Sequence, residues 1–117
     1  MRSDRHRLED ILAACAEIQA SLRWSQADFD SNRFVQSHIY RFLTIIGEAT
    51  FKASDALKQA NPQVPWNRIQ GMRHILVHDY FKINWGLVYE VARDFVPVLR
   101  PQVEAILASL PPDPSAP

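Results

Sequence analysis

Apolar side chains recur every three or four residues from Val35 to Ala60, and this spacing constrains the fold more than any other feature of the chain. Such a stripe covers one face of an α-helix. It also resembles a heptad seam, which favours near-antiparallel packing against a neighbouring helix. We therefore expect one long helix over residues 31–60. The stripe consists of Val35, Ile39, Phe42, Ile46, Ala49, Ala53, Leu57 and Ala60.

The rest of the chain predicts the same all-α fold class. It has only three glycines, and no long run alternates apolar and polar residues with the period of a strand. Pro97 should kink or stop the helix that precedes it, because its ring clashes with the carbonyl four residues back. We expect a compact bundle of about four to five helices forming one domain over residues 1–110, followed by a mobile proline-rich tail at 111–117. The other expected helices span residues 3–22, 65 to 78 or 80, 85–95 and 98–109, with a loop over 24–30 and caps at Ser3 or Asp4, Asp30 or Ser31, and Asn84.

Composition narrows the function classes. The chain has 117 residues, and its 13 basic residues balance 13 acidic ones, which argues against a nonspecific nucleic-acid coat or a polybasic membrane binder. The single cysteine, Cys15, excludes an internal disulfide, and its helical spacing predicts a buried small hydrophobe. No apolar run approaches the roughly 20 residues of a membrane span, and no signal peptide is evident, so the expected location is the cytoplasm.

The densest cluster of chemically active side chains lies between Arg73 and Tyr80. Histidine titrates near neutral pH, and arginine matches phosphate oxygens with two parallel donors. One His and one Arg therefore suffice for metal-independent RNA cleavage, in which the 2′-hydroxyl attacks the adjacent phosphorus and leaves a 2′,3′-cyclic phosphate. On one regular helix Arg73 and His78 stand ~140° apart. Either the helix ends before His78 or a second chain supplies the missing group, so we expect a homodimer.

Plainer interpretations of these residues stay open. An Arg and a His at this spacing occur often by chance, His78 could cap a helix C-terminus, and Tyr80 could be an ordinary half-buried aromatic. Asp79 could pair with Lys82 or Arg73. His74 and His78 have a spacing usable by a metal, but no motif fixes a third ligand, so we predict no metal site. A polar row on the long helix is either a solvated face or a polar wall beside a site: His38, Arg41, Glu48, Lys52 and Asp55.

The segment from Arg73 to Tyr80 resembles the signature of HEPN-domain ribonuclease toxins of the HepT type: Arg, four residues, His, one residue, Tyr. Flanking blocks extend the resemblance from about residue 8 to 109: Ile46-Gly47-Glu48-Ala49, Val64-Pro65-Trp66, Ile69-Gln70-Gly71-Met72 and Leu76-Val77-His78-Asp79-Tyr80-Phe81, then Trp85 and Val88. The resemblance implies a helical bundle that dimerises with its active cleft at the interface. It implies that Arg73 and His78 are the catalytic pair of an endonuclease acting on transfer RNA or messenger RNA, with no cofactor and no metal.

The resemblance also implies a partner and a mode of regulation. In such toxin–antitoxin pairs, of the type VII kind, a minimal nucleotidyltransferase of the MntA type attaches AMP to the motif tyrosine, which is Tyr80 here. His74 stands where the family often has asparagine, and it could tune the site. Asp79, Arg41 and Glu48 are further candidate auxiliary residues. Two alternatives remain: a non-catalytic HEPN module that binds nucleotide or docks a nucleotidyltransferase, and a helical protein whose polar patch is purely structural.

Overall fold

The computed structural model describes residues 3–22, 25–78 and 83–112, and for residues 73–78 it describes the backbone alone. This part of the chain is all-α, as predicted, and contains no strand. The proposed tail beyond residue 112 lies outside the described residues. The helices are α1 (Asp4–Ser21), α2 (Gln26–Ser31), α3 (Arg33–Lys52), α4 (Asp55–Ala60), α5 (Trp66–His78), α6 (Trp85–Glu90), the π-helix η2 (Val91–Phe95) and α7 (Val96–Ser109).

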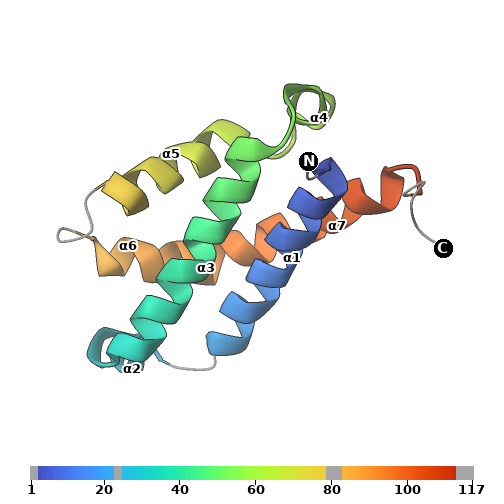
Figure 1. Cartoon of the computed structure of the whole chain (residues 1–117). Coiled ribbons are helices and arrows are strands. Elements are labelled where there is room, and N and C mark those ends of the chain that lie inside the picture. The colour runs from blue at the N-terminus through green and yellow to red at the C-terminus, as the bar shows by residue number, and fades with distance from the viewer. Residues whose placement is uncertain (1–2, 23–24, 79–82, 113–117) are drawn as a thin grey trace.

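The helices form a bundle around α3 (Figure 1). α1 lies alongside α3 and runs in the opposite direction, and α5 packs against α3 as well. α6, η2 and α7 follow one another as a long helical rod that crosses the bundle. The α7 part of this rod packs against α1. The apolar stripes of these helices meet in one core, as expected for amphipathic helices. Its largest fully buried side chains are Phe29, Leu8, Ile11, Ile18, Ile39, Leu43, Ile46, Ile69, Leu99, Val64, Val96 and Val103.

The first helix confirms the expectation from sequence. Ser3 caps α1: its hydroxyl accepts a hydrogen bond from the His6 amide at 3.3 Å, and His6 Nδ1 accepts one from the Ser3 amide at 3.4 Å. This reciprocal arrangement satisfies two amides near the start of the helix. Cys15 is fully buried, and burial raises the pKa of its thiol to about 11. It is therefore a packing residue and a poor nucleophile.

The loop predicted over residues 24–30 is wrong, because a short helix, α2, occupies most of this segment. Ser25 caps it by accepting a hydrogen bond from the Asp28 amide at 3.1 Å. Phe29 anchors it in the core, with its ring centroid 5.2 Å from that of Tyr89. The next helix is capped by Asn32 and not by Asp30 or Ser31, since Asn32 Oδ1 accepts from two amides of the first turn of α3.

The prediction of one continuous helix over residues 31–60 is also wrong, because α3 ends at Lys52 and α4 starts at Asp55. Ala53 is extended, and the Ser54 side chain caps α4 by accepting from the Leu57 amide at 3.1 Å. Asp4 at the start of α1 fixes this break. Its carboxylate accepts hydrogen bonds from the Ser54 amide at 2.9 Å and from the Ser54 hydroxyl at 2.6 Å.

Pro97 was predicted to kink or stop the preceding helix, and the prediction of a stop is wrong, because α6, η2 and α7 follow one another without a gap. The turn preceding it widens to the π-helix η2, and the Val96 amide bonds to the Val91 carbonyl five residues back. A wider turn removes the steric conflict between a proline ring and the carbonyls of the preceding turn. The expected separate helices over 85–95 and 98–109 are therefore joined without a gap.

Candidate active site

The motif helix α5 is positioned by its first two turns. Pro65, predicted as the first residue of this helix, immediately precedes it, and the Pro65 carbonyl accepts from the Ile69 amide at 3.1 Å. The Trp66 indole is buried and donates through Nε1 to the Asn61 carbonyl at 2.9 Å. Ile69 is fully buried. These contacts fix the direction in which the helix carries the motif.

The helical backbone of α5 continues through His78, which excludes a helix that ends before this residue. Arg73 and His78 consequently occupy one helix, at positions ~140° apart around its axis. Helical periodicity places position 78 on the stripe of Asn67 and Gly71, both of which are exposed. The same periodicity places position 73 on the stripe of the buried Trp66. The two positions therefore belong to different faces of the same helix.

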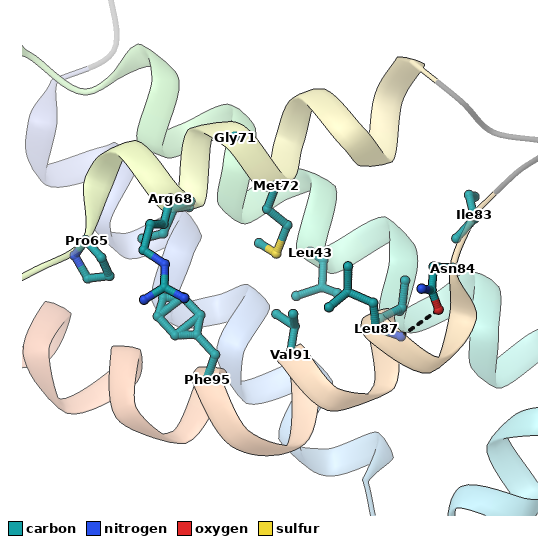
Figure 2. A pocket seen from close by; sticks show the side chains of 12 residues that line it. Leu43, Pro65, Arg68, Gly71, Met72, Ile83, Asn84, Leu87, Val91 and Phe95 are labelled. Atoms are coloured by element: carbon teal, nitrogen blue, oxygen red, sulfur yellow. Dashed lines mark hydrogen bonds between the residues drawn. The ribbon is translucent and has the colours of Figure 1, made fainter.

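Beneath the first half of α5 lies an apolar groove of about 450 Å³, bounded on its other side by α6 and η2 (Figure 2). Met72 points into it from α5, and Leu87 and Val91 face it from the opposite helices. Arg68 extends over one end and Asn84 lies at the other. We call this cavity the apolar groove. Its lining consists of Leu43, Pro65, Arg68, Ile69, Gly71, Met72, Ile83, Asn84, Leu87, Val88, Val91 and Phe95.

Gly71 lies on the solvent side of the middle of α5. Apart from its own helix backbone and chain neighbours, a Cβ atom added there would meet no atom of the described side chains and backbone within 4 Å. Glycine inside a helix costs about 1 kcal/mol relative to alanine, and no close approach within the described chain offsets that cost. The position directly precedes Met72 and Arg73, so the open space borders the motif.

Asn84 caps α6, the first described helix after the motif. Its Oδ1 accepts from the Leu87 amide at 3.1 Å, which makes it the N-cap of α6 as the sequence predicts. We expect Asn84→Ala to lower the free energy of unfolding by about 1 kcal/mol, because the amide loses its acceptor. Urea denaturation measures this. Asn67→Ala, inside α5 and exposed, is the matched control and should not destabilise. Equal stability of both variants would contradict the role of the cap.

Of the predicted site residues, the structure describes the side chains of Arg41 and Glu48 only. Arg41 is exposed on α3, with its guanidinium carbon 5.9 Å from the Phe42 ring centroid. Glu48 is partly exposed two turns later, with its carboxylate 3.8 Å from Lys52 Nζ. These two side chains belong to the polar row of α3, whose largely solvated character matches the plainer interpretation. Asp79 and Tyr80 lie outside the described residues, and the side chains of Arg73, His74 and His78 are likewise not described.

Two further findings concern the described residues. Among residues 3–22, 25–72 and 83–112, no three His, Cys, Asp or Glu side chains gather in a way that could hold a metal ion. No helix in the described part is long and apolar enough to cross a bilayer. The apolar groove, with Arg68 and Phe95 from helices far apart in sequence, was not predicted.

An all-α bundle with Arg, four residues, His on one uninterrupted helix agrees with the HEPN class of proteins that the sequence resembles. The profile of the family described as "Ribonuclease HepT-like" matches residues 11–106, and the chain belongs to this family. It is 33% identical over 108 residues to a predicted RNase of Caldanaerobacter subterraneus subsp. tengcongensis, covering 92% of this chain and 96% of the relative. It is 30% identical over 106 residues to a probable ribonuclease HepT of Thermococcus cleftensis, and the match covers 90% of this chain and 96% of the relative.

A third relative, a predicted RNase of Methanocaldococcus jannaschii, is 33% identical over 79 residues, covering 68% of this chain and 72% of the relative. No solved structure matches the chain significantly. Ribonuclease activity is thus the activity that the family assigns, and it agrees with the expectation from the motif.

Proposed function

We propose that this protein is a metal-independent RNA endonuclease that uses Arg73 and His78, and that it is the toxin of a toxin–antitoxin pair in the cytoplasm. Membership of the HepT-like ribonuclease family carries the proposal. The helical backbone through both motif positions supports it. The substrate is a cellular RNA, transfer RNA or messenger RNA, because the reaction needs the 2′-hydroxyl that DNA lacks.

In the proposed reaction, side chains of the protein carry out every proton transfer. His78, acting as a base, removes the proton of the ribose 2′-hydroxyl. The 2′-oxygen attacks the adjacent phosphorus, and Arg73 stabilises the charge that develops on the phosphoryl oxygens. The bond from phosphorus to the 5′-oxygen then breaks, and His74, as the auxiliary proton donor, protonates the leaving oxygen. The products are a 2′,3′-cyclic phosphate and a 5′-hydroxyl end.

A homodimer supplies what one helix lacks. Positions 73 and 78 lie on different faces of α5, so an Arg and a His converge on one phosphate most readily when they come from two copies. A two-fold axis beside α5 places two arginines and two histidines around one cleft. The open space at Gly71, on the same stripe as position 78, leaves room for the approach of the second chain.

Gly71→Ala should separate stability from function. We expect the substitution to raise the free energy of unfolding by up to about 1 kcal/mol, since the added methyl meets no atom within 4 Å and alanine is the better helix former. We also expect it to weaken dimerisation and cleavage severalfold, because the methyl occupies the space for the partner. Thermal melts, sedimentation equilibrium and cleavage rates measure these effects. Gly86→Ala, at another helical glycine, is the control, and unchanged dimerisation in Gly71→Ala would count against this surface.

Regulation follows from the position of Tyr80, two residues after His78. A minimal nucleotidyltransferase antitoxin transfers AMP from ATP to the phenolic oxygen and releases pyrophosphate. The adduct brings bulk and a negative phosphate to the place where the RNA phosphate binds. It also offers Arg73 a competing anion. Modification at Tyr80 therefore blocks substrate without unfolding the protein.

The decisive experiment is cleavage of RNA by the purified protein in EDTA. Intact mass is recorded on the same sample, so that an AMP adduct is detected before activity is judged. We expect cleavage that persists in EDTA, is absent on DNA of the same sequence, and leaves a cyclic phosphate. Failure of an unmodified, dimeric sample to cleave transfer RNA and messenger RNA pools would reject the endonuclease.

The apolar groove supports one second candidate, a non-catalytic module that binds a nucleotide. Its volume of about 450 Å³ lies within the range of small-molecule sites, and Arg68 stands at one end as a phosphate partner. Calorimetric titration with ATP and AMP tests this candidate. Tight binding that Met72→Trp abolishes, together with no cleavage of RNA, would favour the module over the enzyme.

A further inference from the structure

A second concavity lies at the N-terminal end of α5. The end of α3, the short helix α4 and the first turns of α5 meet there (Figure 1). Its volume is about 680 Å³, and we call it the polar hollow. It shares only Pro65 and Arg68 with the apolar groove. Its lining consists of Phe51, Asp55, Lys58, Gln59, Pro62, Val64, Pro65, Trp66, Asn67, Arg68 and Gln70.

The side chains of the polar hollow include one exposed aromatic ring beside the buried Trp66, two cations, one carboxylate and three amides. Phe51 is 55% exposed, which is unusual for so large an apolar side chain at the end of a helix. Lys58 Nζ donates to the Phe51 carbonyl at 3.4 Å, which keeps the ammonium beside the same turn. Lys58 and Arg68 outnumber the single carboxylate of Asp55, so the hollow is locally positive in a chain of zero net charge.

This combination matches single-stranded RNA. Bases that are not paired stack on exposed aromatic rings, amide side chains bond to base edges, and Lys and Arg contact phosphates. A helix of a protein partner would require a continuous apolar strip. The apolar groove has that character, whereas the polar hollow is rimmed by amides and charges.

The hollow also lies in line with the motif. Asn67 occupies the same exposed stripe of α5 as Gly71 and position 78, about 16 Å along the helix axis from that position. An RNA strand whose phosphate reaches position 78 can therefore continue along this stripe to the hollow. A dinucleotide is too short to fill both places.

We propose that the polar hollow binds unpaired nucleotides of the RNA substrate that flank the cleaved phosphate, with a base on Phe51 and phosphates at Lys58 and Arg68. This inference rests on the proposed endonuclease function and adds a substrate-binding surface to it. The hollow contributes affinity for long RNA and takes no part in the chemical step.

The test compares two matched double variants at opposite ends of α3. F51A/K58A removes an exposed ring and a cation from the hollow. R33A/F34A removes the same pair of groups from the first turn of α3, where Phe34 is 88% exposed. The probe is a fluorescent 20-nucleotide single-stranded RNA of mixed sequence, fully 2′-O-methylated so that it cannot be cleaved. Its dissociation constant is measured by anisotropy at several salt concentrations.

We expect F51A/K58A to raise the dissociation constant about tenfold or more, as loss of base stacking typically does. The slope of log affinity against log salt should fall by about 0.7 for the lost phosphate contact. R33A/F34A should stay within about twofold of the unsubstituted protein. Cleavage of a dinucleotide should have the same kcat/KM in all three proteins. K58E, with the ring of Phe51 intact, should also weaken binding, and thermal melts verify that each variant is folded.

Equal affinities of F51A/K58A and R33A/F34A for the probe would overturn the inference, as would failure of the unsubstituted protein to bind it. The two proposals fail separately. If F51A/K58A weakens binding but no RNA is cleaved by any protein, the endonuclease is rejected and the surface stands. If RNA is cleaved and F51A/K58A binds normally, the surface is rejected and the endonuclease stands.

Discussion

His78→Ala should reduce the rate of RNA cleavage at least about a thousandfold, and Arg73→Ala should do so to a similar degree. A positioned general base contributes roughly 10²–10⁴-fold, and loss of a donor to a developing oxyanion typically costs 10²–10³-fold. Because both groups act on the same phosphate, neither compensates for the other. Initial rates on labelled RNA in EDTA, with sedimentation to verify the dimer, measure the effect.

Two variants outside the motif serve as matched controls for this prediction. His38→Ala removes a partly exposed histidine of α3 whose Nε2 lies 3.5 Å from Oε2 of Glu17. Arg93→Ala removes an exposed arginine of η2 that pairs with Asp94 at 2.7 Å. Exposed ion pairs contribute little to stability, so both variants should fold and cleave normally. Retention of more than a tenth of the activity by His78→Ala or Arg73→Ala would remove that residue from the catalytic pair.

The parts of the fold that follow from local sequence were predictable. Ser3 and Asn84 cap their helices because a polar side chain two or three residues before an open amide is a local signal. Pro65 marks the start of α5 for the same kind of reason. Cys15 is buried because its place in a periodic stripe leaves it no other face. Each of these features depends on residues within one or two turns.

The features that were missed depend on distant residues. The break between α3 and α4 is fixed by Asp4, fifty positions from Ser54, and the apolar stripe runs through it without a change of period. α2 is too short to show a periodicity, and the packing of Phe29 against α6 stabilises it. The π-helix before Pro97 was missed for a different reason, since the sequence shows the local steric conflict but not how the backbone relieves it.

The candidate site likewise has one part that the local sequence predicts and other parts that depend on residues far apart in the chain. The motif from Arg73 to Tyr80 is contiguous, so the sequence alone identifies it. The apolar groove and the polar hollow are assembled from helices that are far apart in the chain, and no local pattern predicts either. Arg68, which contributes to both, stood out in the sequence only as one exposed cation among thirteen basic residues.

Mixing two inactive variants should restore activity if the dimer cleft holds two equivalent sites, each of which draws its Arg and its His from different copies. In a heterodimer of Arg73→Ala with His78→Ala, one composite site then carries both substitutions and the other carries none. Random reassortment yields heterodimers in half of the molecules, so the mixture should recover about a quarter of the unsubstituted activity. Each variant alone should remain at least about a thousandfold impaired.

Co-purification through two different affinity tags isolates the heterodimer and raises the expected recovery to about one half. The control is a heterodimer in which both substitutions lie on one copy and the other copy is unsubstituted. In the composite arrangement each of its sites lacks one group, so it should be inactive. The reverse result, with activity in this control and none in the heterodimer of the single variants, would place Arg73 and His78 of one copy in the same site. The helix α5 would then have to bend at the motif to bring positions ~140° apart onto one phosphate.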